Sequence, residues 1–142
     1  MPQSGILTET EFALDGRLGE LDRLADETAR FCREHALSED VMFDLNLALE
    51  ELFTNSVRHG GCAGMENAVL VRIENRPDGV NAHFSDRGVP FNPLSAPVPN
   101  IEAPLEERGS GGLGIHLVRQ LMTDLEYRRE DGWNKVSMRR PC

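Results

Sequence analysis

A glutamate and an asparagine one helical turn apart form the first pair whose spacing suggests chemistry. Segment 50–59 reads Glu-Glu-Leu-Phe-Thr-Asn-Ser-Val-Arg-His, so Glu51 and Asn55 are related as i and i+4 and share one helix face. A carboxylate with a side-chain amide one turn further on can hold a hard cation and orient a hydroxyl or a water. The alternative interpretation is an ordinary solvated helix face.

A second polar segment, Ser-Asp-Arg-Gly at 85–88, comes where an apolar strand is expected to end. Asp86 at a strand terminus can accept a hydrogen bond from a flat ligand, and an adenine amino group fits that description. Gly88, which has no side chain, lets a backbone come close to such a ligand. A common Asp-x-Gly turn is the alternative interpretation.

A glycine-rich segment, Arg-Gly-Ser-Gly-Gly-Leu-Gly at 108–114, opens directly into an apolar helix. Free backbone N–H groups and the positive end of a helix dipole favour an anion such as phosphate. The Rossmann pattern does not apply, because no strand feeds directly into the segment, and the Gly-Lys-Ser/Thr of a Walker loop is absent. Phosphate binding and a plain glycine-rich loop are therefore both open.

The spacing of apolar residues predicts the elements that position these segments. Stripes at intervals of three and four predict helices, with Ser38 as an N-cap, over 17–35, over 38–58 and after the glycine cluster. Alternation predicts strands over 7–14, 68–75, 80–85, 125–130 and 135–139, the last two joined by a turn at 131–134. This order predicts an α/β (α+β) two-layer sandwich with the helices on one face of one sheet.

The composition narrows the classes of partner. The 142 residues hold 24 Asp+Glu against 15 Lys+Arg, a formal net charge of −9. We expect no direct nucleic-acid partner and no membrane partner, because phosphates and anionic headgroups attract cationic surfaces. The length suits a single domain over 1–142, and with no visible signal peptide we expect a cytoplasmic protein.

Taken in order, the three polar segments resemble the GHKL (histidine kinase-like) ATP-binding family. The resemblance covers nearly the whole chain and implies the Bergerat fold, with a mixed, mainly antiparallel sheet. It also implies ATP and Mg²⁺ as cofactors. Five prolines lie between Pro90 and Pro104, and an ATP lid is implied at about residues 89–110. Segment 50–59 is most similar to the stand-alone serine/threonine kinases that act as bacterial anti-sigma factors.

The resemblance implies a role for each matched residue. Glu51 is similar to a general base that takes the proton of a protein serine, and Arg108 to a lid arginine that reaches the γ-phosphate. Asn55 corresponds to the Mg²⁺ ligand, and Asp86 to the residue that binds the adenine amino group, with Gly88 beside it. The other implied nucleotide contacts are Arg58, His59, Pro90, Phe91, Gly109, Ser110, Gly111, Gly112, Leu113 and Gly114.

One position departs from the common family pattern. The family's Asp-x-Gly-x-Gly reads Asp-x-Gly-x-Pro-Phe here, with Pro90 in place of the second glycine. The proline form is similar to that of the anti-sigma kinase branch. Because proline fixes its own φ angle, we expect Pro90 to stiffen the base of the lid and to weaken or slow nucleotide binding.

The resemblance implies an ATP- and Mg²⁺-dependent protein serine/threonine kinase. Its phosphoryl acceptor would be an anti-anti-sigma (STAS) protein, and it would also sequester a sigma factor and form a homodimer. Sigma binding through opposite charges would weaken with added salt. The alternatives are an ATP-binding interaction module without significant kinase activity and a split histidine kinase catalytic domain.

Overall fold

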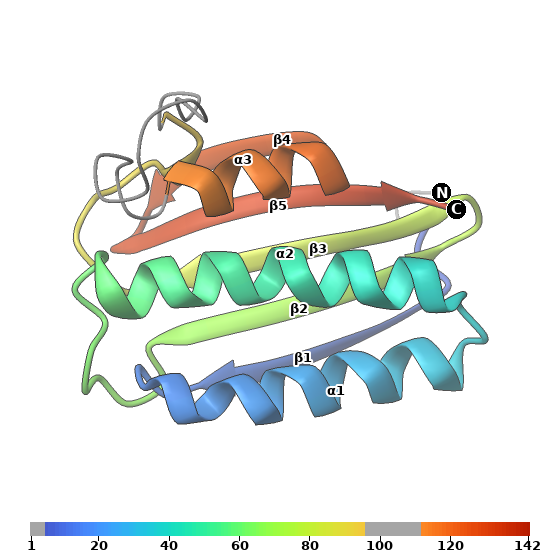
Figure 1. The fold of residues 1–142 in the computed structure, drawn as a ribbon, viewed down its shortest axis with the longest axis horizontal. Helices are drawn as coiled ribbons and strands as arrows, with labels where there is room; N and C mark the ends of the chain where they lie inside the picture. Colours follow the sequence, from blue (N-terminus) through green and yellow to red (C-terminus); the bar gives the residue numbers. More distant parts are fainter. Residues whose placement is uncertain (1–4, 96–111) are drawn as a thin grey trace.

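A single sheet forms one layer of the computed structural model, which describes residues 5–95 and 112–142. Its strands are β1 (Thr8–Leu14), β2 (Val69–Arg76), β3 (Gly79–Asp86), β4 (Thr123–Glu130) and β5 (Trp133–Pro141). They lie in the order β1-β2-β3-β5-β4. The predicted sheet is mixed and mainly antiparallel, but every pairing between the described strands is antiparallel. The reason is that the chain reverses direction between successive elements (Figure 1).

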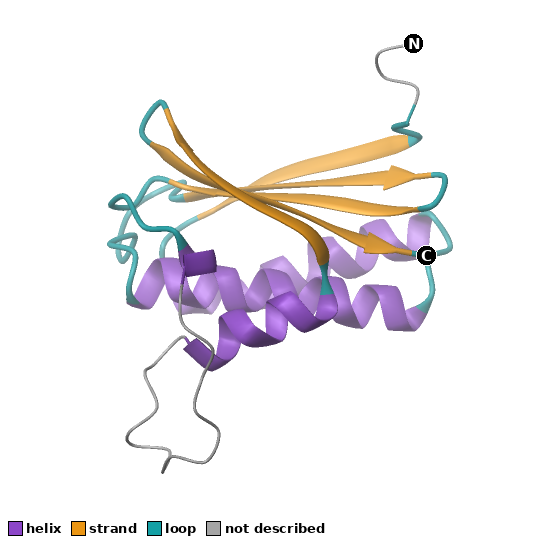
Figure 2. Ribbon diagram, turned by 90° about the horizontal axis from the view of Figure 1, so that it is seen from above, coloured by secondary structure: helices purple, strands orange, loops and turns teal. Residues whose placement is uncertain are grey.

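Helices form the second layer and cover one face of the sheet (Figure 2). In the described residues they are α1 (Leu21–Glu34), α2 (Glu39–Arg58) and α3 (Gly112–Leu121). The α/β sandwich predicted from the order of elements is therefore confirmed. Short 3-10 turns occupy Leu18–Glu20, where the first helix was expected to begin, and Pro93–Ser95, in a stretch expected to be irregular. None of the described helices is long and apolar enough to cross a bilayer.

Helix α2 begins as its sequence predicts. The Ser38 side-chain oxygen accepts a hydrogen bond from the backbone N–H of Val41 at 3.2 Å, which satisfies a donor that the first helical turn leaves free. Glu39 and Asp40 occupy that first turn, where carboxylates interact favourably with the helix dipole.

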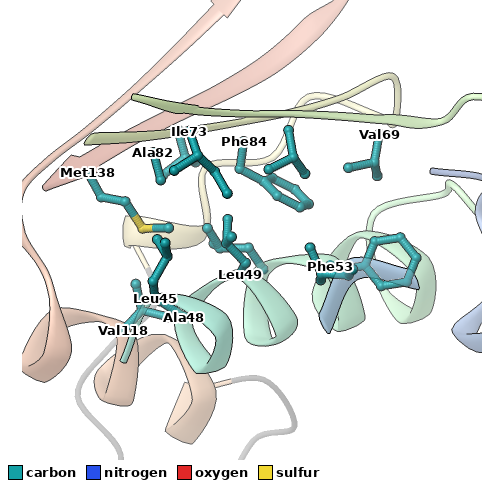
Figure 3. Packing of buried hydrophobic residues seen from close by; sticks show 14 of the residues in the cluster. Leu45, Ala48, Leu49, Phe53, Val69, Ile73, Ala82, Phe84, Val118 and Met138 are labelled. Carbon is teal, nitrogen blue, oxygen red and sulfur yellow. The ribbon is translucent and has the colours of Figure 1, made fainter. Parts of the chain in front are cut away.

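Apolar side chains of α2 fill the space between the two layers. Leu49 and Phe53 are fully buried, and Figure 3 shows them beneath Ile73 and Val69 of β2. Each such buried side chain stabilises the fold by roughly 1.5–3 kcal/mol relative to exposure. Because this packing sets the rotation of α2 about its axis, it also sets where the polar side chains of 50–59 point.

The C-terminal hairpin is tighter than its sequence predicts. Asp131 and Gly132 alone form the turn, both with positive φ, at 53° and 85°, as a two-residue hairpin turn requires. Trp133 and Asn134, expected in the turn, instead begin β5. As a result, Asn134 pairs across the sheet with Asp86 at the end of β3.

Candidate active site

The Asp86 carboxylate accepts three hydrogen bonds from the residues around it. It is 8% exposed, at the end of β3. Its Oδ2 accepts a hydrogen bond from the Ser56 hydroxyl of α2 at 2.7 Å. Its Oδ1 accepts one from the Gly88 backbone N–H and one from the Asn134 side-chain amide, both at 2.9 Å. Three donors from three parts of the chain therefore hold the carboxylate in one orientation.

Two members of this cluster, Ser56 and Asn134, are absent from the set of site residues predicted from the sequence. Ser56 lies in the polar segment 50–59, and its position next to Asn55 was an available signal. Asn134 carried no local signal, because it reaches Asp86 only through the pairing of β3 with β5.

Position 88 needs a glycine because its backbone lies against the backbone of Gly60. A side-chain Cβ at this position would overlap the carbonyl oxygen of Gly60, in the loop that follows α2. The same carbonyl accepts a hydrogen bond from the Val89 backbone N–H at 3.0 Å. The predicted contact of Gly88 with a nucleotide stays a prediction, but the close approach of β3 to the end of α2 already explains the glycine.

Cys62 lies beside this cluster as a buried thiol. Burial and, next, the neighbouring Asp86 carboxylate raise the pKa of the Cys62 thiol to about 11. The thiol is therefore protonated at neutral pH, which fits a packing role rather than a nucleophile.

A small recess connects Asp86 with α2. Its volume is about 10 Å³, which is close to the least space that one water molecule needs. The recess is lined by Leu52, Asn55, Ser56, Phe84, Asp86, Phe91, Pro93, Asn134 and Val136. The structure thus brings the predicted residues Asn55, Asp86 and Phe91 together. At this volume the recess is too small to hold a flat ring.

Glu51 lies on the side of α2 that faces α3, whereas Asn55, one turn further on, lines the recess at Asp86. Asn55 is 7% exposed and Glu51 is half-buried. The Glu51 carboxylate packs directly against Gly114 in the first turns of α3, where an added Cβ would overlap its Oε2. Burial and, next, the charge of Glu50 raise the pKa of Glu51 above its ordinary value. A carboxylate with a raised pKa is better suited to accept a proton.

The other predicted contacts divide into three groups. Arg58 and His59 end α2 and are exposed, as is Pro90, and none of the three lines the recess. Gly112 and Leu113 begin α3. Arg108, Gly109, Ser110 and Gly111 lie outside the described residues, as does most of the predicted lid, of which 89–95 is described.

Comparison with known proteins decides the family. The model of the histidine kinase-like ATPase domain matches residues 14–140. The chain belongs to this family. A curated relative of this histidine kinase-like ATPase, the serine/threonine-protein kinase BtrW of Bordetella bronchiseptica, is 31% identical over 101 residues, which is 71% of each chain.

Solved structures share the fold of this histidine kinase-like ATPase. The RsbU and RsbW domains of Rv1364c from Mycobacterium tuberculosis align with a TM-score of 0.69 at 15% identity, over 94% of this chain and 32% of that longer chain. The SiaB-SiaC complex from Pseudomonas aeruginosa aligns with a TM-score of 0.59 at 16% identity, over 99% and 93%. Family and fold class are thereby confirmed, and the predicted kinase class is confirmed by the relative BtrW.

Proposed function

We propose that the protein is an ATP-dependent kinase that phosphorylates serine or threonine on a STAS-type anti-anti-sigma protein and sequesters a sigma factor in the cytoplasm. The observation that carries the proposal is the arrangement around α2. This helix presents Glu51 to α3 and Asn55 and Ser56 to the recess at Asp86. One rigid element thus joins a candidate base to a candidate nucleotide site. Membership of the histidine kinase-like ATPases and the likeness to BtrW support the proposal.

The nucleobase end of the proposed site is formed by Asp86. Its carboxylate is acceptor-only when ionised. Gly88 and Asn134 donate to Oδ1, and the Ser56 hydroxyl donates to Oδ2, which leaves a lone pair on Oδ2 for one more hydrogen bond. An adenine amino group matches that remaining acceptor. Phe91 and Pro93 close the recess, so nucleotide entry requires their displacement, and Pro90 before them is expected to make this displacement slow.

Asn55 is the proposed Mg²⁺ ligand. The described residues hold no group of three or more Asp, Glu, His or Cys side chains that could bind a metal ion by themselves. A single amide oxygen beside the nucleotide recess fits Mg²⁺, which keeps several waters and binds mainly through one or two side chains and substrate phosphates. When bound, MgATP supplies the phosphoryl group and the metal neutralises part of the phosphate charge.

Glu51 is the proposed base for the acceptor hydroxyl. Its raised pKa lets it take the proton of a serine or threonine as the hydroxyl oxygen attacks. Its position against Gly114 places it at the start of α3, where residues 109–114 and Arg108 are proposed to surround the phosphates. Phosphoryl transfer requires the protein mainly to position the reactants and to neutralise the phosphate charge.

The partners belong to the proposal as well. A net charge of −9 suits a sigma factor with basic surfaces and predicts that the complex weakens with added salt. A homodimer and a single domain over residues 1–142 complete the proposed organisation.

Phosphotransfer from labelled ATP to a candidate STAS protein tests the proposal. Glu51→Gln should slow transfer by about a hundredfold or more, because the proton acceptor is lost, while ATP affinity stays close to that of the wild type. At a pH well above the pKa of Glu51, Glu50→Gln is the matched control. That side chain points about 100° away around the helix and accepts a hydrogen bond from the Asn46 side-chain amide at 2.9 Å.

Two outcomes would contradict the proposal. If Glu51→Gln transferred phosphate as fast as the wild type, Glu51 would not be the base. If the protein bound ATP but phosphorylated no candidate STAS protein, an ATP-binding interaction module would be favoured.

A further inference from the structure

Asn134 uses its full hydrogen-bonding capacity inside the protein. Its Nδ2 donates to Asp86 Oδ1 at 2.9 Å and to the Val89 carbonyl oxygen at 2.7 Å. Its Oδ1 accepts from the Tyr127 hydroxyl at 2.7 Å and from the Phe91 backbone N–H at 3.2 Å. The side chain is 3% exposed. An amide has two donors and two acceptor lone pairs, so every site is occupied.

These four bonds join the C-terminal hairpin to the end of β3 and to the segment that directly follows it. Asp86 ends β3, Val89 and Phe91 begin the segment that closes the recess, and Tyr127 belongs to β4. Arg129 of β4 strengthens the same junction by donating to the Gly88 carbonyl oxygen at 2.8 Å. Asn134 therefore contacts both the Asp86 carboxylate, which Ser56 and Gly88 also hold, and segment 89–91.

We propose that Asn134 is a positioning residue for nucleotide recognition, which fixes the orientation of Asp86 and couples it to segment 89–91. This inference rests on the proposed function, because it assigns Asp86 to the nucleobase. A ligand that moves Phe91 must break or shift the bond from its N–H to Asn134. The same amide carries that change to Asp86, so opening of the recess and orientation of the carboxylate occur together.

Only an amide of this length fits the position. An aspartate has the same shape but, when ionised, cannot donate to Asp86 or to the Val89 carbonyl. It would also place two carboxylates side by side, which raises the pKa of one of them. The charged or titratable groups near the new carboxylate are Asp86 itself, the Cys62 thiol, the Tyr127 hydroxyl and the Arg129 guanidinium.

Binding of ATP by Asn134→Asp at several pH values tests the inference. At about pH 8 the variant should bind ATP at least ~10-fold more weakly than the wild type, because two ionised carboxylates repel and the donors are lost. Near pH 5.5 its affinity should recover to within about threefold, because one carboxyl is then protonated and donates. The affinity of the wild-type protein for ATP should change much less between these two pH values.

Two further variants complete the experiment. Asn81→Asp makes the same substitution on β3, away from the recess, and should bind ATP like the wild type at both pH values. Tyr127→Phe removes one donor to Asn134 and should weaken ATP binding by about threefold, with a folded far-UV spectrum. This variant keeps the inference testable if Asn134→Asp does not fold.

The outcomes separate this inference from the proposed function. If Asp86→Asn loses ATP binding while Asn134→Asp and Tyr127→Phe bind ATP like the wild type, the positioning role is wrong and the nucleotide site stands. If Asp86→Asn also binds ATP like the wild type, the nucleobase site is not at Asp86, and the proposed site fails with it.

Discussion

Asp86 and Glu51 are the two carboxylates of the proposed site, and the protein holds them in different ways. Asp86 is buried and accepts hydrogen bonds from Ser56, Gly88 and Asn134. Glu51 is half-buried and is held by packing against Gly114, and no hydrogen bond from another described side chain reaches its carboxylate. A group that recognises a ligand gains from a fixed orientation, whereas a base must have a free lone pair for its proton.

The two glycines at these carboxylates differ in the same way. At Gly88 an added Cβ would meet the backbone carbonyl of Gly60, which is fixed by the packing of the loop after α2. At Gly114 it would meet the end of the flexible Glu51 side chain. The first contact is between backbones and the second is with the proposed base, so identical substitutions should have different consequences.

Gly88→Ala should have the largest effect on the framework. The overlap with a backbone atom forces β3 and the loop after α2 apart, at a cost of about 2–3 kcal/mol of unfolding free energy. The measurement is urea unfolding, and ATP affinity should fall in parallel because Asp86 moves. Gly19→Ala is the control, since an added Cβ there meets nothing within 4 Å. Equal stability of Gly88→Ala and the control would contradict the backbone contact.

Gly114→Ala should reduce activity without this loss of stability. The Glu51 carboxylate can rotate away from the new methyl group, so unfolding free energy should change by less than about 1 kcal/mol. The rate of phosphotransfer at saturating ATP should fall about tenfold, because the carboxylate of Glu51, the proposed base, is displaced. If Gly114→Ala lost as much unfolding free energy as Gly88→Ala, the expected difference between the two glycines would be wrong.

The pH dependence of phosphotransfer should show the smallest effect. The proposed base acts in its ionised form, so the rate should fall as the pH drops through the raised pKa of Glu51. Burial is the main cause of that raised pKa and the charge of Glu50 the second. Glu50→Gln should therefore move the acid limb of the pH–rate profile to lower pH, because removing the Glu50 charge lowers the pKa of Glu51. If the acid limb of Glu50→Gln coincided with that of the wild type, Glu50 and Glu51 would not interact.

Local patterns in the sequence predict the helices and strands and the Glu51–Asn55 pair of the candidate site. The helical spacing places Glu51 and Asn55 on one face, and Ser38 marks the start of their helix. The turn of the last hairpin was placed too broadly, because Trp133 and Asn134 have no local feature that assigns them to a strand. Their place in β5 follows from pairing with β3 and β4.

The sequence by itself determined the family, the order of elements and the candidate base with its neighbouring amide, because these depend on residues within one or two helical turns. Only the tertiary structure decided how Asp86 is held. Its partners are Ser56, 30 residues earlier, and Asn134, 48 residues later. Hydrogen bonds over such separations exist only after α2, β3 and β5 have packed together, so no local pattern encodes them.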